Sequence, residues 1–303
     1  MADLLLIDGN NLAIRLFLSQ AVQNGSKEIV GNYDLWRYLM FTNMIGYANS
    51  DTSRIVVAID GPGGSWRKIA FKPYKANRKA KRDASEFDWS IFFKEYSNFM
   101  LSIDKHTPIK VINIERVEGD DVIGTIASKK YSFDRNIKIV TADSDYKQLI
   151  RPHVAVYDPM KGEYMECKDT EQWLREQSLM GQQKDNIYNV LTPDDWGETP
   201  ETKEKRKPGF GPVACKKVFD FGFDEWLDKN NARKLYMRNR FLIDLAMIPE
   251  QIQQAIIKEY NLKKDYDIDR VNELFEIYGW TSLTEEFGPE DNAKAHNVLK
   301  RIC

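Results

Sequence analysis

The chain has 303 residues and a mass of 35.3 kDa, and its 44 Lys and Arg residues against 46 Asp and Glu residues give a formal net charge of −2. This near balance excludes a chain that acts as a whole as a polycation or as an acidic tail. With 42% apolar residues and a mean hydropathy of −0.54, the chain has enough core-forming side chains for roughly one to three domains in water.

Short β-branched and aliphatic runs recur through the first half of the chain, with amphipathic stretches between them. This alternation predicts an α/β fold in which a mostly parallel sheet carries helices on both faces. The runs are far shorter than the roughly 20 apolar residues of a membrane span, so we expect no signal peptide and no membrane anchor. The predicted strands are Leu4–Ile7, Ile55–Ile59, Ile109–Ile114, Ile137–Val140 and Val154–Tyr157.

Beyond about Thr170 the β-type runs end and helical spacing takes over, which predicts a second, helical part. A polar stretch, Thr192–Pro208, contains three prolines and the run Lys-Glu-Lys-Arg-Lys, and is typical of a loop or an extended hairpin. After it, Gly209 and Gly211 are spaced for a tight turn into a helix that begins near Pro212. Backbone N–H groups at such a helix start can bind a phosphate, although glycine turns before helices are common.

Each predicted strand stops at an acidic residue or leads into one, and the ends of the first four strands carry the most informative acids. The carboxyl ends of parallel strands open on one crevice, so we expect these side chains to converge. A single Asp after a strand is more often a helix cap or turn former than a ligand, but four acidic strand ends, two of them with clusters, favour a shared site. The seven acids are Asp8, Asp60, Glu118, Asp120, Asp121, Asp143 and Asp145.

Seven carboxylates in one crevice would repel one another and take up protons unless cations neutralised them. Oxygen ligands without His or Cys select Mg²⁺ or Mn²⁺ over zinc. Cys167, Cys215 and Cys303 form no CxxC pair, so we expect neither a disulfide framework nor a zinc site, and a reducing cytoplasm is the expected compartment. The three His residues lie in no acidic cluster and are expected to be bystanders.

A basic segment follows Asp60 directly. Eight Lys and Arg residues precede the next acid, and three aromatic residues are interleaved with them. Such a segment beside an acidic crevice indicates a nucleic-acid ligand, with phosphates meeting the bases and aromatic rings stacking on unpaired bases. A solvated helix face is the alternative interpretation. The bases are Arg67, Lys68, Lys72, Lys75, Arg78, Lys79, Lys81 and Arg82, and the aromatic residues are Trp66, Phe71 and Tyr74.

The order and content of these motifs resemble the 5′ nuclease family, which includes flap endonucleases and 5′-3′ exonucleases. The resemblance extends to about Tyr260, and the length and the insertion look most like phage members of the family. The motifs that carry it are Ile7-Asp8-Gly9-Asn10-Asn11, Asp60-Gly61-Pro62, Tyr74-Lys75-Ala76-Asn77-Arg78, Glu118-Gly119-Asp120-Asp121, Thr141-Ala142-Asp143-Ser144-Asp145 and Gly181-Gln182-Gln183-Lys184-Asp185-Asn186-Ile187.

The resemblance implies two domains. Residues 1–180 would form a PIN-like α/β nuclease domain with a basic arch at about 62–105. Residues 181–303 would form a helical DNA-binding domain with a helix-three-turn-helix motif and an insertion at about 188–208. The implied activity is two-metal phosphodiester hydrolysis that removes RNA primers and 5′ flaps from lagging-strand fragments in phage replication.

The resemblance also implies roles for single residues. Asp8, Asp60, Glu118, Asp120 and Asp143 would frame a first metal ion, and Asp145 and Asp185 would serve a second. Asp121, the other acid of the family's EGDD motif, is also an expected metal residue. Lys75 and Arg78 would grip the scissile phosphate. The expected nucleic-acid contacts are Arg67, Lys72, Tyr74, Lys75, Arg78, Lys79, Gly209, Gly211 and Lys216.

The implied cofactors are two Mg²⁺ ions, for which Mn²⁺ could substitute, and a K⁺ ion at the helix-three-turn-helix. The implied partners are 5′-flap or nicked duplex DNA, RNA–DNA hybrid, a single-strand binding protein and a sliding clamp. We expect a monomer that needs no membrane, in the host cytoplasm if a phage encodes it.

The chain departs from the family pattern at two places. Gln182 stands where the family usually has an Asp, and Tyr188–Pro208 replaces a short link to the glycine hairpin. Two other functions remain open from the sequence. One is a binding protein for branched DNA with impaired catalysis; the other is a haloacid-dehalogenase-type phosphatase, although Asp8-Gly9-Asn10 lacks the second acid that this class requires.

Overall fold

The structure is a computed structural model that describes residues 3–23, 33–85, 87–132, 135–203, 205–280, 283 and 291–302; the side chains of 21–23, 81 and 291–294 are not described. The chain forms two compact units. Unit 1 comprises Met1–Gly64, Glu86–Glu166 and Glu250–Cys303, and unit 2 comprises Ser65–Ser85 and Cys167–Pro249.

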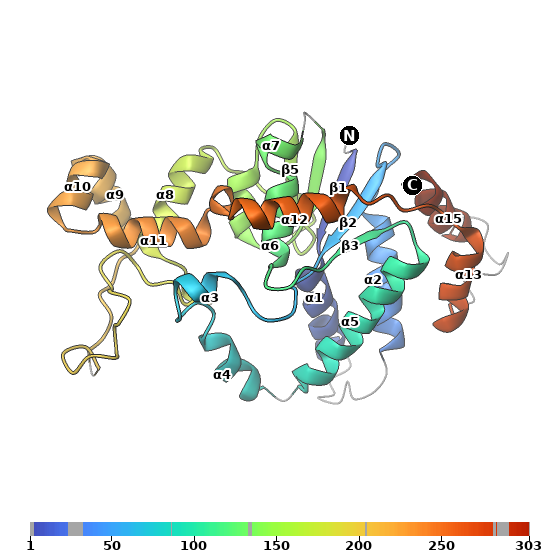
Figure 1. Ribbon diagram of the computed structural model, residues 1–303, viewed down its shortest axis with the longest axis horizontal. Coiled ribbons are helices and arrows are strands. Elements are labelled where there is room, and N and C mark those ends of the chain that lie inside the picture. Colours follow the sequence, from blue (N-terminus) through green and yellow to red (C-terminus); the bar gives the residue numbers. More distant parts are fainter. Residues whose placement is uncertain are drawn as a thin grey trace. The chain divides into compact units, whose positions relative to one another are not determined.

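Unit 1 is built on a sheet with strand order β3-β2-β1-β4-β5-β6 (Figure 1). All pairs of neighbouring strands are parallel except β5 and β6, which are antiparallel. The register places Asp8 beside Ala58 and Ile7 beside Val140, so β1, β2 and β4 end at nearly the same level. The strands are β1 (Leu4–Asp8), β2 (Arg54–Ala58), β3 (Lys110–Ile112), β4 (Ile137–Val140), β5 (Val154–Asp158) and β6 (Glu163–Tyr164).

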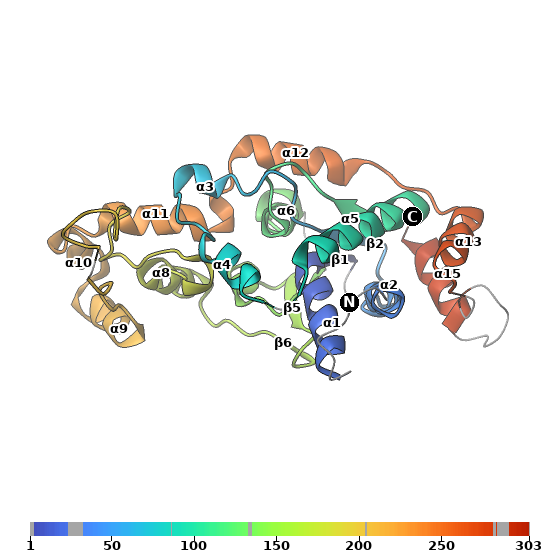
Figure 2. The same ribbon diagram turned by 90° about the horizontal axis from the view of Figure 1, so that it is seen from below.

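Helices cover both faces of this sheet, which confirms the predicted fold class. Figure 2 shows α6 and α12 on one side of the strands and α1 on the other. The helices of unit 1 are α1 (Gly9–Gln23), α2 (Asp34–Gly46), α5 (Trp89–His106), α6 (Gly119–Ile126), α7 (Lys129–Ser132), α12 (Glu250–Asn261), α13 (Ile268–Ile277) and α15 (Asp291–Arg301), with the 3-10 helix η1 (Ser144–Leu149).

The alternation of side chains along β1 explains the two covered faces. Leu5 and Ile7 belong to a large buried core with residues of α1, α2 and α5, among them Trp36 and Phe92. Leu6, between them, is equally buried but lies outside that core. Because successive side chains of a strand point to opposite faces, a strand covered on both sides is a continuous apolar run, as seen in the sequence.

All five predicted strands are present, within three residues at each end. The sixth, β6, has two exposed residues and no apolar run, and therefore left no signal in the sequence. The compact units also differ from the predicted domains. Helix α12 packs on α6 and β3, so residues from Glu250 onward cluster with unit 1, whereas Ser65–Ser85, part of the expected arch, clusters with unit 2.

Unit 2 is helical. Two small apolar clusters lie among its described residues: one includes Cys215 and Val218, and the other joins Phe71 and Tyr74 to Leu242. The helices are α3 (Arg67–Ala70), α4 (Asn77–Asp83), α8 (Thr170–Met180), α9 (Pro212–Phe221), α10 (Phe223–Lys229) and α11 (Arg233–Ile243), with the 3-10 helices η2 (Gln183–Asp185) and η3 (Leu245–Met247).

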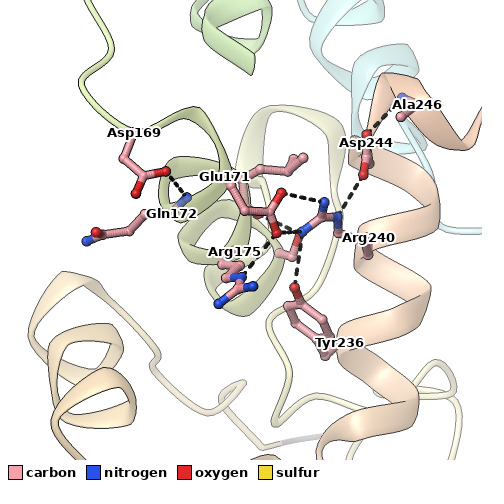
Figure 3. Close-up of polar contacts among 10 residues, drawn as sticks. Asp169, Glu171, Gln172, Arg175, Tyr236, Arg240, Asp244 and Ala246 are labelled. Carbon is pink, nitrogen blue, oxygen red and sulfur yellow. Dashed lines mark hydrogen bonds and ion pairs between the residues drawn. The ribbon is translucent and has the colours of Figure 1, made fainter. Parts of the chain in front are cut away.

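A charged network holds α11 against α8, as Figure 3 shows. The Arg240 guanidinium donates two hydrogen bonds of 2.9 Å to the carboxylate of Glu171 and one of 2.8 Å to Asp244. Arg175 donates to the same Glu171 carboxylate at 3.1 Å. These partners lower the pKa of Glu171, the Arg240 hydrogen bond being the largest cause. Two-pronged Arg–carboxylate contacts fix orientation as well as distance, so this network sets how the two helices of unit 2 pack.

The polar stretch before α9 is a loop, as predicted: residues 188–203 and 205–211 contain no helix or strand. Arg238 of α11 anchors it by donating to the Tyr188 carbonyl at 2.8 Å and by pairing with Asp194. No helix in the described ranges is long and apolar enough to cross a membrane.

Candidate active site

The strand order places a topological switch point beside β1, because the chain runs from β1 to β2 and β3 on one side and then crosses to β4 and β5 on the other side. In open α/β sheets, ligands bind outside the carboxyl ends of the strands at such a point. Asp8 is the last residue of β1, Asp60 follows β2 by two residues, and Asp143 follows β4 by three. The fold therefore brings the predicted acids of unit 1 to the edge where a ligand would bind.

Asp8 is buried and held from two sides. The Asn11 backbone N–H donates to its Oδ1 at 3.0 Å, and the Thr141 hydroxyl donates to its Oδ2 at 2.9 Å. The Asn11 side chain in turn accepts a 3.1 Å hydrogen bond from the Ala142 N–H. The first helix and the end of β4 are thus tied together around the Asp8 carboxylate.

Asp60 is exposed, but its position is fixed by its neighbours. Its Oδ1 accepts a 2.9 Å hydrogen bond from the Gly119 N–H at the start of α6. Its own N–H donates to Asn10 Oδ1 at 3.3 Å, and the buried Tyr96 hydroxyl donates to the same oxygen at 3.1 Å. Gly61 is required here, since a Cβ at that position would lie 1.7 Å from the Ile114 carbonyl oxygen.

Glu118 and Asp121 cap the start of α6. The Glu118 side chain accepts from the backbone at Asp121, and Asp121 Oδ2 accepts a 2.9 Å hydrogen bond from the Glu118 N–H. Both side chains are buried. This reciprocal capping box gives Asp121 a structural partner within its own helix.

The other predicted acids of unit 1 lie on α6 and on the turn that carries Tyr146. The Tyr146 hydroxyl donates a 2.7 Å hydrogen bond to Asp120 Oδ1. Asp143 caps η1 by accepting a 2.9 Å hydrogen bond from the Asp145 N–H, so one short turn carries both acids of the Asp-Ser-Asp motif. Burial, and then the charges of Asp120, Asp8 and Asp143, raise the pKa of Tyr146 well above its usual value of 10.0.

A bound cation would offset the cost of burying negative charge in the crevice. Burial is the main cause that raises the pKa of Asp8 from 3.8 to about 6, and the charges of Asp143 and Asp60 add to it, against the lowering effect of its two hydrogen bonds. The oxygen-only donor set fits Mg²⁺ or Mn²⁺. Within the described ranges, however, no three Asp, Glu, His or Cys side chains form a group that could hold a metal ion. The acids lie along one edge of the sheet, but their side chains do not converge on a single point.

We expect Asp8→Asn to stabilise the metal-free protein above about pH 6. Because the folded state raises the pKa of Asp8, it binds this proton more tightly than the unfolded chain does. As the pH rises from about 4 to about 6, the wild type therefore loses stability, by up to about 3 kcal/mol, and the variant does not. Urea unfolding without divalent cations should show the stability gap between the two proteins opening from pH 4 to pH 7.5. A gap that does not change with pH would contradict the expectation.

In unit 2, two residues with different expected roles are paired with each other. The Arg78 guanidinium donates to the buried Asp185 carboxylate at 2.6 Å, and the Lys75 N–H donates to the Asp185 carbonyl at 2.7 Å. Asn186 adds a 2.7 Å hydrogen bond from its side chain to the Pro73 carbonyl. Lys75 and Asn186 both adopt left-handed backbone conformations, with φ of 53° and 55°. The segment around Lys75 and Arg78 is therefore fastened to the loop that carries Asp185.

The structure corrects part of the predicted nucleic-acid surface. Arg67 is 2% exposed, and its Nε donates to the Leu242 carbonyl at 2.8 Å. Trp66, Phe71 and Tyr74 are buried as well, and Phe71 and Tyr74 fill the apolar cluster with Leu242. These side chains build the core of unit 2, and we remove Arg67 and Tyr74 from the expected contacts. Lys72 and Lys79 are exposed, so they stay among the proposed contacts.

The glycine turn leads into α9 as predicted, with Gly211 as the N-cap and Pro212 as the first helical residue. A Cβ at Gly209 or Gly211 would meet no atom within 4 Å, so the turn is open on its outer side. Lys216 is exposed on the same helix.

Sequence reasoning missed the residues that hold the acids in place. Tyr146 directly follows Asp145 and could have been noticed from that position. Tyr96 lies 86 residues from Asn10, its partner, and nothing in the local sequence relates the two.

The fold and its acidic edge belong to a known class of nucleases. The family model described as "5′-3′ exonuclease, N-terminal resolvase-like domain" matches residues 3–178. The chain therefore belongs to the 5′-3′ exonuclease family, as the motifs indicated.

Among curated proteins, the ribonuclease H of Enterobacteria phage T4 is 27% identical over 301 residues, which cover 92% of this chain and 93% of that protein. Flap endonuclease Xni of Shewanella sediminis is 28% identical over 71% of this chain and 75% of its own. A structure of bacteriophage T5 flap endonuclease with DNA and metal ions aligns over 91% of this chain and 98% of its own, with a TM-score of 0.59. At 16% identity, that likeness shows the fold alone.

Proposed function

We propose that the chain is a divalent-cation-dependent 5′ nuclease that cuts phosphodiester bonds near the 5′ ends of branched or nicked nucleic acid. The observation that carries this proposal is that Asp8, Asp60, Asp120 and Asp143 lie along one edge of the sheet, where the charges of Asp143 and Asp60 help to raise the pKa of Asp8. The T5 flap endonuclease and T5 5′-exonuclease structures, which share this fold, are described with DNA and metal ions and with zinc, and this supports the proposal.

Asp8, Asp60, Glu118, Asp120 and Asp143 would hold a first Mg²⁺ ion, and Asp145 and Asp185 would serve a second. When bound, the ions would lower the pKa of a water molecule and stabilise the leaving oxygen. The chain itself would orient and neutralise the substrate. Lys75 and Arg78 would contact the phosphate at the cut, and Lys72 and Lys79 the neighbouring phosphates. The N–H groups at the start of α9, with Lys216, would contact duplex backbone, where the K⁺ ion is also expected.

The substrates we propose are 5′ flaps, nicked duplexes and RNA–DNA hybrids. The T4 relative is named ribonuclease H and another relative is named a flap endonuclease, which supports removal of RNA primers and flaps in phage replication. A phage single-strand binding protein and a sliding clamp are the proposed partners, and a monomer in the host cytoplasm is the proposed form.

A cleavage assay tests the proposal. A 5′-labelled flap substrate should be cut near its branch point when Mg²⁺ is present and remain intact in EDTA. Binding without cutting in Mg²⁺ would instead support the alternative of a binding protein for branched DNA. The phosphatase alternative is set aside because the family match covers the whole first half of the chain.

Gln182 should weaken the second metal site. Gln182 is buried next to η2, and its backbone carbonyl accepts a hydrogen bond from the Asp185 N–H at 3.2 Å. An amide offers one neutral oxygen where a carboxylate would offer charge, so we expect Gln182→Asp to shift the Mg²⁺ titration of cleavage to lower concentration with little change in DNA affinity. Asp194 and Asp195, in the insertion, are the acids that could fill this role instead, and Asp194 is paired with Arg238. An unchanged or right-shifted titration would mean that Gln182 does not limit metal binding.

A further inference from the structure

Tyr146 is a buried tyrosine whose hydroxyl meets a proposed metal ligand. The residue is 1% exposed, and its hydroxyl donates to Asp120 Oδ1 at 2.7 Å. A buried tyrosine hydroxyl needs a hydrogen-bond partner, and the partner here is a carboxylate from a different element of the fold. We propose that Tyr146 is a positioning residue that holds the Asp120 carboxylate in the orientation needed to bind the divalent cation. This inference rests on the proposed function.

The place of Tyr146 in the chain supports this role. It lies on η1, immediately after Asp145, and Asp143 caps the same turn. Asp120 lies on α6, 26 residues away. The hydroxyl therefore ties the α6 acid to the turn that carries two further proposed ligands. A shift of either element would break this short hydrogen bond, so the contact fixes the position of the two groups of acids relative to each other.

The chemistry of the contact points the same way. A carboxylate can turn about its terminal bond, and a single donor on one oxygen limits that rotation. Acids that bind metals are commonly held by hydrogen bonds from outer residues, and loss of such a partner typically costs about 10–100-fold in metal affinity or activity. Phenylalanine would fill nearly the same volume as tyrosine, so the hydroxyl can be removed without opening a large cavity.

The test is metal binding by Tyr146→Phe without DNA. Mn²⁺ titration followed by electron paramagnetic resonance should show about 10–100-fold weaker binding than in the wild type. Mn²⁺ should also raise the melting temperature of the variant less than that of the wild type at the same concentration, because stabilisation by a ligand follows its affinity. In a cleavage assay, high Mg²⁺ should restore much of the lost rate. A purely structural tyrosine would lower the melting temperature and leave the Mn²⁺ affinity unchanged.

Tyr260→Phe is the matched control. Tyr260 is also a buried residue of unit 1, and its hydroxyl accepts a 2.7 Å hydrogen bond from Arg135. Arg135 precedes the start of β4, whereas the acids follow the carboxyl ends of the strands. The control variant should lose a similar amount of stability and keep wild-type Mn²⁺ affinity.

The Asp120→Asn variant distinguishes a failure of the metal assignment from a failure of the role proposed for Tyr146. If this variant binds Mn²⁺ as tightly as the wild type, the metal assignment in the proposed function is wrong. If Asp120→Asn weakens binding while Tyr146→Phe stays within about twofold of the wild type, below the range expected for an outer partner, the role of Tyr146 is overturned and the metal site stands.

Discussion

Replacing Asp120 or Asp143 with asparagine should reduce flap cleavage by more than about 100-fold and leave flap binding near the wild-type level. Loss of an outer hydrogen-bond partner already costs about 10–100-fold, and loss of a ligand should cost more. Binding should persist because phosphate contacts come from other residues. Single-turnover cleavage and fluorescence anisotropy with the same substrate measure the two properties.

Asp158→Asn is the control for this expectation. Asp158 also ends a strand and is buried, but its Oδ1 accepts a 2.9 Å hydrogen bond from the Met160 N–H, as a turn former does. The control should cleave at the wild-type rate. Cleavage within tenfold of the wild type by Asp120→Asn or Asp143→Asn would remove that residue from the metal site.

Lys75→Ala and Arg78→Ala should slow cleavage and flatten its dependence on salt. Each phosphate contact that is lost lowers the slope of log K against log salt by about one. Arg78 should show the larger effect on chemistry, because it also neutralises the buried Asp185 carboxylate at 2.6 Å. Lys300→Ala removes an exposed charge on α15, outside the proposed nucleic-acid contacts, and should leave the slope unchanged. If the Lys75 and Arg78 variants keep the wild-type slope, the basic segment is a solvated face.

Much of unit 1 could be predicted because its signals are local. Buried parallel strands are continuous apolar runs, and β1, β2, β4 and β5 were found from such runs. The acids at the strand ends needed only the rule that parallel strands open on one edge. The short antiparallel β6 was not predictable, since its two exposed residues have no pattern of their own.

The residues that hold the acids in place could not be predicted from the sequence. Nothing near Asp120 indicates that a tyrosine 26 residues later donates to it, because that contact depends on how η1 packs against α6. In the basic segment, by contrast, the sequence led to a prediction that was wrong. Its aromatic residues suggested stacking on bases, yet Phe71 and Tyr74 supply the apolar core that a short helical unit needs. The residue types alone indicate a charged segment. Only the packed structure shows which of its side chains are buried in the core and which are exposed.

The central claim is that the acids at the switch point hold divalent cations. Crystals of the protein soaked in Mn²⁺ and measured at the manganese absorption edge test it directly. We expect an anomalous peak within coordination distance of carboxylates from Asp8, Asp60, Asp120 or Asp143, and loss of that peak in crystals of Asp120→Asn. Manganese found only at other surface carboxylates, with none at these four, would contradict the account.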